Sequence, residues 1–354
     1  MKRLVSLALC LIMALAMLAG CSSNEETTAA DTTTADTTTA STEASTEGKV
    51  EAVEKTKVYV TPEWVNSVIQ GEQPESENYV IIHTAWGEVD DSSDYAKSHI
   101  PGAVHMNTDY IEEEVYWNIR TGEEITQVMK DYGITKDTTV ICYGSGHNRV
   151  AFVCLWAGVE NVKLLDGNFE AWEKAGFETE SGIIEPTPTE EDFGVEIPAH
   201  PEYVYSIDEV QDKLENDDNF RLVSIRSWEE FIGETSGYSY IPQAGEPKGA
   251  IWGKDSGDYE DENGIAVESD TVAKYLAEFD ATLDNDLAFY CGTGWRATTP
   301  FLILYEEGYT NIHLYDGGWH QWVMDESRPV QVGDPRTDDC QYMTVGEMST
   351  DKAE

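Results

Sequence analysis

One pattern of apolar segments and glycine turns occurs twice in this chain of 354 residues. Residues 138–143 match residues 287–290, and residues 166–172 match residues 316–322. The offset is 291 − 144 = 147 residues at the turn and 322 − 172 = 150 at the tryptophan, so the two copies differ there by only three residues. Repetition of a whole supersecondary pattern indicates two copies of one domain.

Each copy alternates short strands with helices. In the first copy we expect strands at 79–83, 138–143 and 162–165 and helices at 123–132 and 150–157; in the second, strands at 222–226 and 287–290 and a helix at 297–305. Such alternation predicts an α/β fold, with two tandem domains, each a mainly parallel sheet flanked by helices. Hydrophobic residues make up 40% of the chain, which is enough for packed cores.

The domain boundaries follow from composition. We expect a first domain at 56–185, a second at 203–333 and a polar tail at 334–354 that is an extension and not a domain. Residues 186–202 hold four prolines among acidic and polar residues, which is typical of a linker.

The most informative segment is a glycine-rich turn between an expected strand and an expected helix of the second copy. Its residues are Cys291, Gly292, Thr293, Gly294, Trp295 and Arg296. Glycines allow successive N–H groups to point into one concavity, and a helix N-terminus adds positive potential. Both effects favour a thiolate. We therefore predict that Cys291 is a nucleophile and that Arg296 binds an anionic substrate group.

The equivalent turn of the first copy lacks a nucleophile. When Arg149 is aligned with Arg296, Gly144 falls where Cys291 stands. Cys142 lies two residues earlier, inside a strand, and Cys154 lies on an apolar helix face, so we expect both to be small core residues. A disulfide between them is the alternative. The first domain is thus predicted to be inactive.

Composition excludes several classes of function. The formal net charge is −46, which argues against nucleic-acid binding. The six cysteines include no CxxC pair and no Cys/His cluster at zinc spacing, so we expect no metal.

The N-terminus carries a targeting signal. Lys2 and Arg3 precede an apolar stretch that ends in small residues before Cys21, which resembles a bacterial lipoprotein signal at residues 1–21. The resemblance implies lipid attachment at Cys21 and a place on the extracytoplasmic face of a bacterial cell membrane. An ordinary signal peptide or an uncleaved anchor is the alternative. Residues 22–55, rich in Thr, Ser, Asp and Glu, are expected to be a disordered tether.

Together, the motifs resemble the tandem-domain rhodaneses, the thiosulfate/3-mercaptopyruvate sulfurtransferase family. The likeness covers roughly residues 56–333 and rests on residues 99–103, 166–172, 224–233, 236–238, 249–250, 291–296 and 316–319. It implies that Cys291 takes the outer sulfur of a small anionic donor, thiosulfate or 3-mercaptopyruvate, and passes it to a thiol or cyanide. No cofactor is implied.

The resemblance also assigns Arg226 to substrate binding, because an arginine of the family reaches the cleft from the neighbouring strand. An ion pair with Glu229 or Glu230 is the equally weighted alternative. Trp295 either forms a side of the expected substrate pocket or packs beneath it. Trp319 and His320 are expected near the same substrate cleft.

The sequence departs from the family at several points. Ser224 stands where an aspartate is usual, residues 83–86 replace an Asp-x-Arg pattern, and the loop ends in Trp295-Arg296.

Two other interpretations of the function stay open. A cysteine phosphatase would need Cys-x5-Arg, one residue longer than the Cys-x4-Arg found here, and a tethered, non-catalytic rhodanese module could carry sulfur or bind a partner without turnover.

Overall fold

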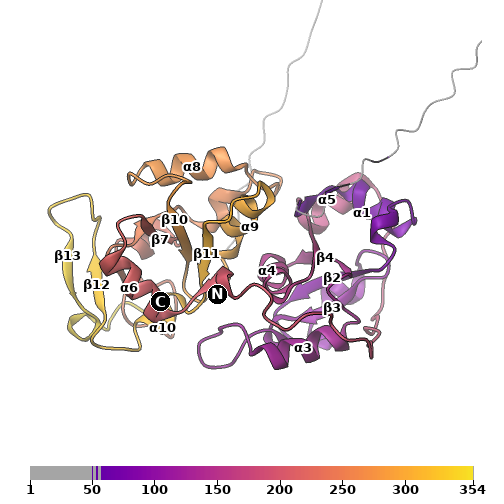
Figure 1. Cartoon of the computed structure of the whole chain (residues 1–354), viewed down its shortest axis with the longest axis horizontal. Coiled ribbons are helices and arrows are strands. Elements are labelled where there is room, and N and C mark those ends of the chain that lie inside the picture. Colours follow the sequence, from indigo (N-terminus) through magenta and orange to yellow (C-terminus); the bar gives the residue numbers. More distant parts are fainter. Residues whose placement is uncertain (1–49, 51–52, 55–56, 354) are drawn as a thin grey trace, which may run out of the picture. The chain divides into compact units, whose positions relative to one another are not determined.

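The computed structural model describes residues 50, 53–54 and 57–353 (Figure 1). These residues fall in one unit of the chain, Lys49–Glu354. The predictions for residues 1–21, including lipidation of Cys21, and for nearly all of the tether lie outside the described residues. Within the described part, no helix is both long enough and apolar enough to cross a membrane.

The first half is built on a five-stranded parallel sheet. Its order is β1 (Tyr59–Val60), β5 (Asn161–Leu165), β4 (Thr139–Gly144), β2 (Tyr79–Ala85) and β3 (Val104–Asn107). The helices are α1 (Pro62–Ile69), α2 (Ser93–Lys97), α3 (Gly122–Asp131), α4 (His147–Ala157) and α5 (Asn168–Ala175). Successive residues of β4 enter different cores, because side chains of a strand alternate between the two faces. Ile141 packs with α1 and α5, whereas Cys142 packs with α3 and α4.

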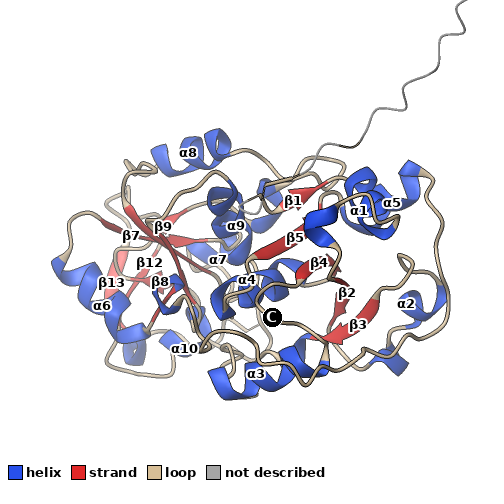
Figure 2. Ribbon diagram, turned by 45° about the vertical axis from the view of Figure 1, so that its right-hand side comes forward, coloured by secondary structure: helices blue, strands red, loops and turns tan. Residues whose placement is uncertain are grey.

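The second half repeats this architecture (Figure 2). Its parallel sheet has the order β6 (Val204–Tyr205), β11 (Ile312–Tyr315), β10 (Asp286–Tyr290), β7 (Phe220–Ser224) and β9 (Ile251–Trp252). Its helices are α6 (Ile207–Asn216), α7 (Trp228–Phe231), α8 (Ser269–Ala277), α9 (Thr298–Glu306) and α10 (Gly318–Trp322). The cores again lie on both faces, with α6 and α10 on one and α8 and α9 on the other. The predicted α/β repeat is confirmed.

Strand register supports the alignment of the two halves. Tyr143 pairs with His83 in the first sheet, and Tyr290 pairs with Ser224 in the second. The glycine-rich turn therefore follows the equivalent strand in both copies, β4 in the first and β10 in the second. One strand is shorter than predicted: β7 ends at Ser224, so Arg226 lies in the turn after the strand.

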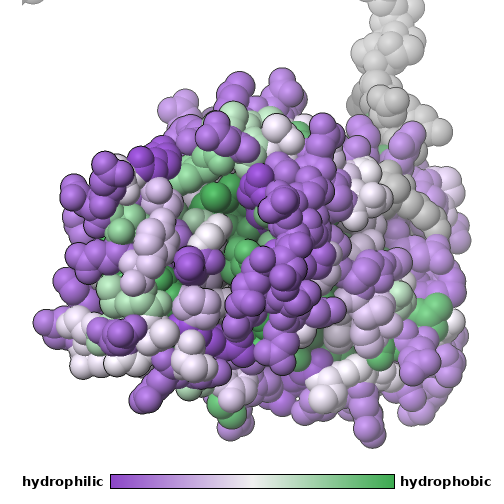
Figure 3. Space-filling model, turned by 60° about the vertical axis from the view of Figure 1, so that its left-hand side comes forward, coloured by the Kyte–Doolittle hydropathy of each residue, from purple (hydrophilic) through white to green (hydrophobic). Residues whose placement is uncertain are grey.

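A small antiparallel sheet belongs to the second half alone. It joins β8 (Glu246–Pro247), β12 (Pro329–Val332) and β13 (Gln341–Thr344). Through β13 and the buried Val345, the C-terminal tail packs on the core of α6 and α10. Figure 3 shows a largely hydrophilic face, with hydrophobic residues mainly in recessed areas, as the acidic composition leads one to expect.

The two halves share one apolar core. Phe152 of α4 meets Phe301 of α9 edge to face, with ring centroids 4.7 Å apart. Beside them, the Asn148 amide donates to Thr299 Oγ1 at 3.0 Å. The helices that follow the two equivalent turns thus pack against each other.

Candidate active site

The cysteine loop runs from the end of β10 at Tyr290 to the start of α9 at Thr298. The carbonyl groups of Cys291 and Gly292 accept hydrogen bonds from the N–H groups of Trp319 (2.8 Å) and His320 (3.0 Å) on α10. By contrast, the N–H groups of residues 292–296 donate to no atom of the described residues. With the carbonyls held by α10 and five successive amides unpaired, the backbone is available to bind an anion.

One residue differs between the two halves beside the glycine-rich turns. Gly318 of the second half and Asn168 of the first occupy matching places with nearly the same left-handed backbone, φ 57° and 56°. The Asn168 side chain binds the first residue of the first turn, accepting from the Gly144 N–H at 2.7 Å and donating to the Gly144 carbonyl at 3.3 Å. At Gly318, a Cβ would lie 2.6 Å from the Gly292 carbonyl carbon and 2.7 Å from the Cys291 oxygen. A side chain at this place of the second turn would therefore crowd the carbonyls of Cys291 and Gly292.

The first turn also excludes a cysteine for steric reasons. Gly144 has φ 101°, and a Cβ there would clash with the Thr84 carbonyl oxygen and lie 3.0 Å from the Thr84 nitrogen. Cys142 and Cys154 are buried, and burial raises the pKa of the Cys154 thiol to about 12 and that of Cys142 well above its usual range. Among the described cysteines, all four are free thiols.

The thiol of Cys291 is nearly covered, since the residue is 1% exposed. Its charge affects the pKa of Tyr238, Tyr240 and Arg296, so these side chains lie around it. Burial, with a smaller effect of Cys291, raises the pKa of Tyr238 to about 12. The Tyr238 hydroxyl sits where a side chain at Gly292 would be and accepts from Arg296 Nη2 at 2.9 Å. Tyr240 is 47% exposed, in contrast to the covered thiol.

Arg226 is fully buried and bonded to protein through Nε, Nη1 and Nη2. It contacts Glu230, Glu246 and the carbonyls of Gly245 and Ser236 at 2.8–3.3 Å. The alternative of an ion pair with Glu230 is therefore what the structure contains. To touch a donor, Arg226 would have to release these partners.

Arg296 lies closer to the surface, with 25% of its side chain exposed. It binds Glu230 through both terminal nitrogens at 2.8 Å. Although burial opposes ionisation, the hydrogen bonds from Arg296 and the charges of Arg226 and Arg296 lower the pKa of Glu230 to about 2. Glu230 is thus an anion that holds both guanidinium groups in place.

A second buried carboxyl, Glu246 on β8, takes the place of the aspartate that Ser224 lacks. Glu246 accepts from Ser224 Oγ at 3.2 Å, from Arg226 at 2.9 Å and from the Tyr290 hydroxyl. Burial raises its pKa to about 8 against the opposing effect of Arg226. Asp255, 3.4 Å from Arg296, is 41% exposed and screened by water. The two guanidinium groups, Arg226 and Arg296, are thus paired mainly with Glu230 and Glu246.

Two of the remaining predicted residues, Trp295 and His320, contact the first half. The Trp295 indole donates to both carboxyl oxygens of Glu112, at 2.6 and 2.8 Å. His320 is hydrogen-bonded through Nε2 to the Val115 carbonyl at 3.2 Å, and the buried Trp319 donates to Gln243. Trp295 and His320 therefore lie between the halves.

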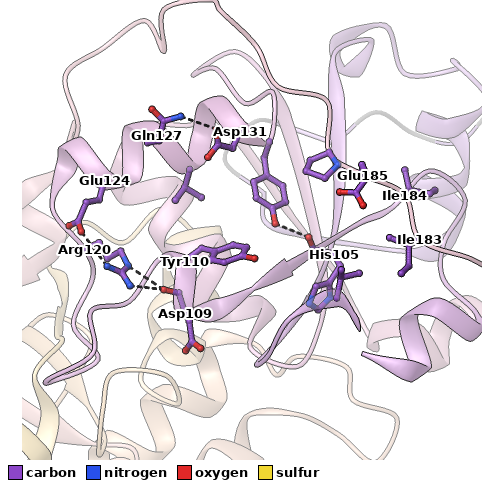
Figure 4. A pocket seen from close by; sticks show the side chains of 14 residues that line it. His105, Asp109, Tyr110, Arg120, Glu124, Gln127, Asp131, Ile183, Ile184 and Glu185 are labelled. Carbon is purple, nitrogen blue, oxygen red and sulfur yellow. Dashed lines mark hydrogen bonds and ion pairs between the residues drawn. The ribbon is translucent and has the colours of Figure 1, made fainter. Parts of the chain in front are cut away.

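No cluster of metal ligands occurs among the described residues. A cavity of about 500 Å³ lies elsewhere in the first half, between α3 and residues 183–186 (Figure 4). Tyr132 and His105 line it together with Tyr110, Arg120 and several carboxylates. None of the predicted site residues lines this cavity.

These features define a tandem α/β protein with a single thiol at the head of an anion-binding turn. The rhodanese-like domain family matches the chain twice, at residues 74–175 and 206–325, and the chain belongs to this family. The chain is 38% identical over 287 residues to the thiosulfate sulfurtransferase YnjE of Escherichia coli K12. The alignment covers 78% of this chain and 65% of the length of that relative.

Solved structures agree with this assignment. The crystal structure of YnjE matches with a TM-score of 0.74, at 38% identity, over 78% of this chain and 68% of that one. A Chlorobium limicola enzyme of anaerobic ergothioneine biosynthesis, solved with its natural substrate trimethyl histidine, matches with a TM-score of 0.74 at 34% identity, over 79% of this chain and 71% of that one.

Sequence reasoning missed Glu246, Glu112 and the contrast between Gly318 and Asn168. Glu112 begins a run of three glutamates and Glu246 stands alone in a chain with 68 acidic residues, so no local pattern singles out either of them. The contrast between Gly318 and Asn168 was visible in the repeat, because Asp-Gly-Gly of residues 316–318 aligns with Asp-Gly-Asn of residues 166–168.

Proposed function

We propose that this protein is a sulfurtransferase that carries sulfur as a persulfide on Cys291. The observation that supports it best is the row of five unpaired N–H groups directly after the one cysteine that heads such a turn. A persulfide anion is large, singly charged and well matched to backbone donors.

The reaction proceeds in two halves. The Cys291 thiolate attacks the outer sulfur of thiosulfate, the donor's S–S bond breaks, and sulfite leaves with the bonding electrons. A thiol or cyanide acceptor then attacks the outer sulfur, and Cys291 departs as thiolate. Covalent exchange of this type gives ping-pong kinetics.

Thiosulfate is the first choice of donor, because the E. coli relative is named for it and the guanidinium groups of Arg226 and Arg296 suit an anion. The second choice of donor is 3-mercaptopyruvate.

An aromatic cluster beside the thiol favours a second candidate acceptor. Trp117 packs on Tyr240 (4.9 Å between centroids) and on His320 (5.0 Å), and Tyr240 packs on Tyr238 (5.4 Å). Aromatic faces bind quaternary ammonium groups. The trimethyl histidine of the Chlorobium enzyme carries such a group, so a trimethylated histidine is a candidate that would gain one sulfur on its ring.

The membrane location is part of the proposal. A lipid on Cys21 would place the folded part on the extracytoplasmic face of a bacterial cell membrane, with the tether between them. Support comes only from the sequence of residues 1–21.

Mass spectrometry of the intact protein mixed with thiosulfate or 3-mercaptopyruvate tests the activity. We expect a gain of one sulfur on the peptide that holds Cys291, and its loss on addition of cyanide, a thiol or trimethylated histidine, whichever is the acceptor. The Cys291→Ala variant should fold and gain no sulfur. Wild-type turnover by this variant would refute the role of Cys291, and a wild-type protein that gains no sulfur from either donor would leave the non-catalytic module as the better account.

A further inference from the structure

We propose that the first half, although it has no nucleophile, positions the cysteine loop of the second half through Glu112 and Arg149. The inference rests on the proposed function of that loop. It makes the silent domain a working part of the active site, with two positioning residues that do not touch the sulfur.

A buried charged network crosses the boundary between the halves. Arg149 is fully buried and binds Glu112 (Nε to Oε1, 2.9 Å) within its own half and Asp316 (Nη1 to Oδ1, 2.6 Å) in the other. Its Nη2 donates to the Trp117 carbonyl at 3.1 Å. Asp316 is 5% exposed and Glu112 3%. Buried charges are stabilised only when their partners are held in place, so this network fixes the relative position of its members.

Two residues of the cysteine loop rest directly on that network. The Trp295 indole donates to both oxygens of Glu112, and its ring packs where a side chain at Gly146 would be. Gly294 lies against the ion pair: a Cβ there would meet Asp316 Oδ1 at 2.5 Å and Arg149 Nη1 at 3.1 Å. The first part of the loop is held by α10 of its own half, and the last part by the first half.

A single segment of the first half supplies most of these contacts. Residues 112 and 119 pair as an antiparallel bridge, and between them the Glu113 carboxylate accepts from the N–H groups of Val115 and Tyr116 at 2.7 and 2.6 Å. The segment reaches the second half again where the Ile119 N–H donates to Asp316 Oδ2 at 2.7 Å. An element ordered by its own hydrogen bonds can hold the loop with little flexibility.

Arg149 also shows how the repeat diverged. It aligns with Arg296, yet it is paired with Glu112 of its own half and with Asp316 of the other half. The arginine of the silent turn has thus become a support for the active one.

The test measures single-turnover sulfur loading of Cys291 in the full-length protein. Trp295→Phe keeps an aromatic ring, although a smaller one, and deletes the N–H donor; Glu112→Ala deletes the acceptor, and Glu112→Gln restores one. We expect the first two to slow loading about tenfold to a hundredfold, the range for a loop shifted by about 1 Å, with little change in the donor concentration needed for half-maximal rate. Glu112→Gln should stay within about threefold of wild type, since its amide oxygen can still accept from the indole.

The double variant distinguishes positioning from general damage. If one bond carries the effect, Glu112→Ala with Trp295→Phe should be no slower than the slower single variant. Glu124→Gln, which removes an exposed carboxylate paired with Arg120 in the same half, is the matched control and should load normally. Loading within twofold of wild type in folded Trp295→Phe, or multiplicative losses in the double variant, would overturn the inference.

A second measurement, which does not depend on sulfur transfer, tests the positioning role separately from the proposed function. The rate at which iodoacetamide alkylates Cys291 reports loop position whether or not sulfur is transferred. Loosening the loop should expose the 1% accessible thiol, so Trp295→Phe should be alkylated several times faster than wild type. If wild type takes no sulfur, the proposed function fails, and an unchanged alkylation rate in Trp295→Phe still overturns the positioning role.

Discussion

Gly318→Asn would convert the active turn into a copy of the silent one. Asparagine tolerates the left-handed backbone better than other side chains, as Asn168 shows at φ 56°, so the backbone penalty should be about 1 kcal/mol. The steric effect is larger. A Cβ at 318 would lie 2.6 Å from the Gly292 carbonyl carbon, and ordinary contact begins at 3.4 Å, so the loop must retreat by 3.4 − 2.6 = 0.8 Å.

That displacement acts on the two carbonyls that orient the loop. The hydrogen bonds from Trp319 and His320 to Cys291 and Gly292 would lengthen or break, and the new side chain would bind the N–H group of Cys291, as Asn168 binds that of the aligned Gly144. A shift close to 1 Å costs about a hundredfold in rate. We expect sulfur loading of Cys291 to fall by about that factor while thermal unfolding moves by only a few degrees.

Mass-resolved loading with thiosulfate, followed over time, measures the effect, and circular dichroism confirms the fold. Asn168→Gly is the matched control in the first half; it should cost about 1 kcal/mol of stability through the lost bonds to Gly144 and leave loading unchanged. Normal loading by a folded Gly318→Asn protein would refute the argument that glycine at position 318 keeps the cysteine loop in place.

Three further outcomes are expected. Cys142→Ala should load sulfur at the wild-type rate, because that thiol is sealed in the core; a loss as large as that of Cys291→Ala would show that the alignment of the turns is wrong. Burial, with the nearby His105, lowers the pKa of His83 from 6.5 to about 4, so the unfolded chain binds more protons than the folded one between these pH values. The free energy of unfolding, measured in urea, should therefore drop by up to about 3 kcal/mol as the pH falls from 6.5 to 4. The His83→Asn variant should show a smaller dependence on pH. Cys21→Ala should move the protein from the membrane to the soluble fraction of cells, and retention in the membrane would contradict lipid anchoring.

The sequence by itself determined the repeat, the α/β class and the position of the glycine-rich turn that begins with Cys291. Apolar periodicity and glycine turns are local signals, and a duplicated pattern makes each half a check on the other. The aligned turns were enough to show that Gly144 replaces Cys291 in the first half.

Only the tertiary structure decided what surrounds the thiol. Arg226 is an available cation in the sequence, but folding brings Glu230 and Glu246 onto it and leaves it buried. Trp295 finds Glu112, 183 residues away, and Arg149 finds Asp316 across the boundary of the halves. Long-range pairing of charged side chains depends on how the two sheets and their helices pack, which no local pattern encodes, and that packing joins a silent domain to the active one.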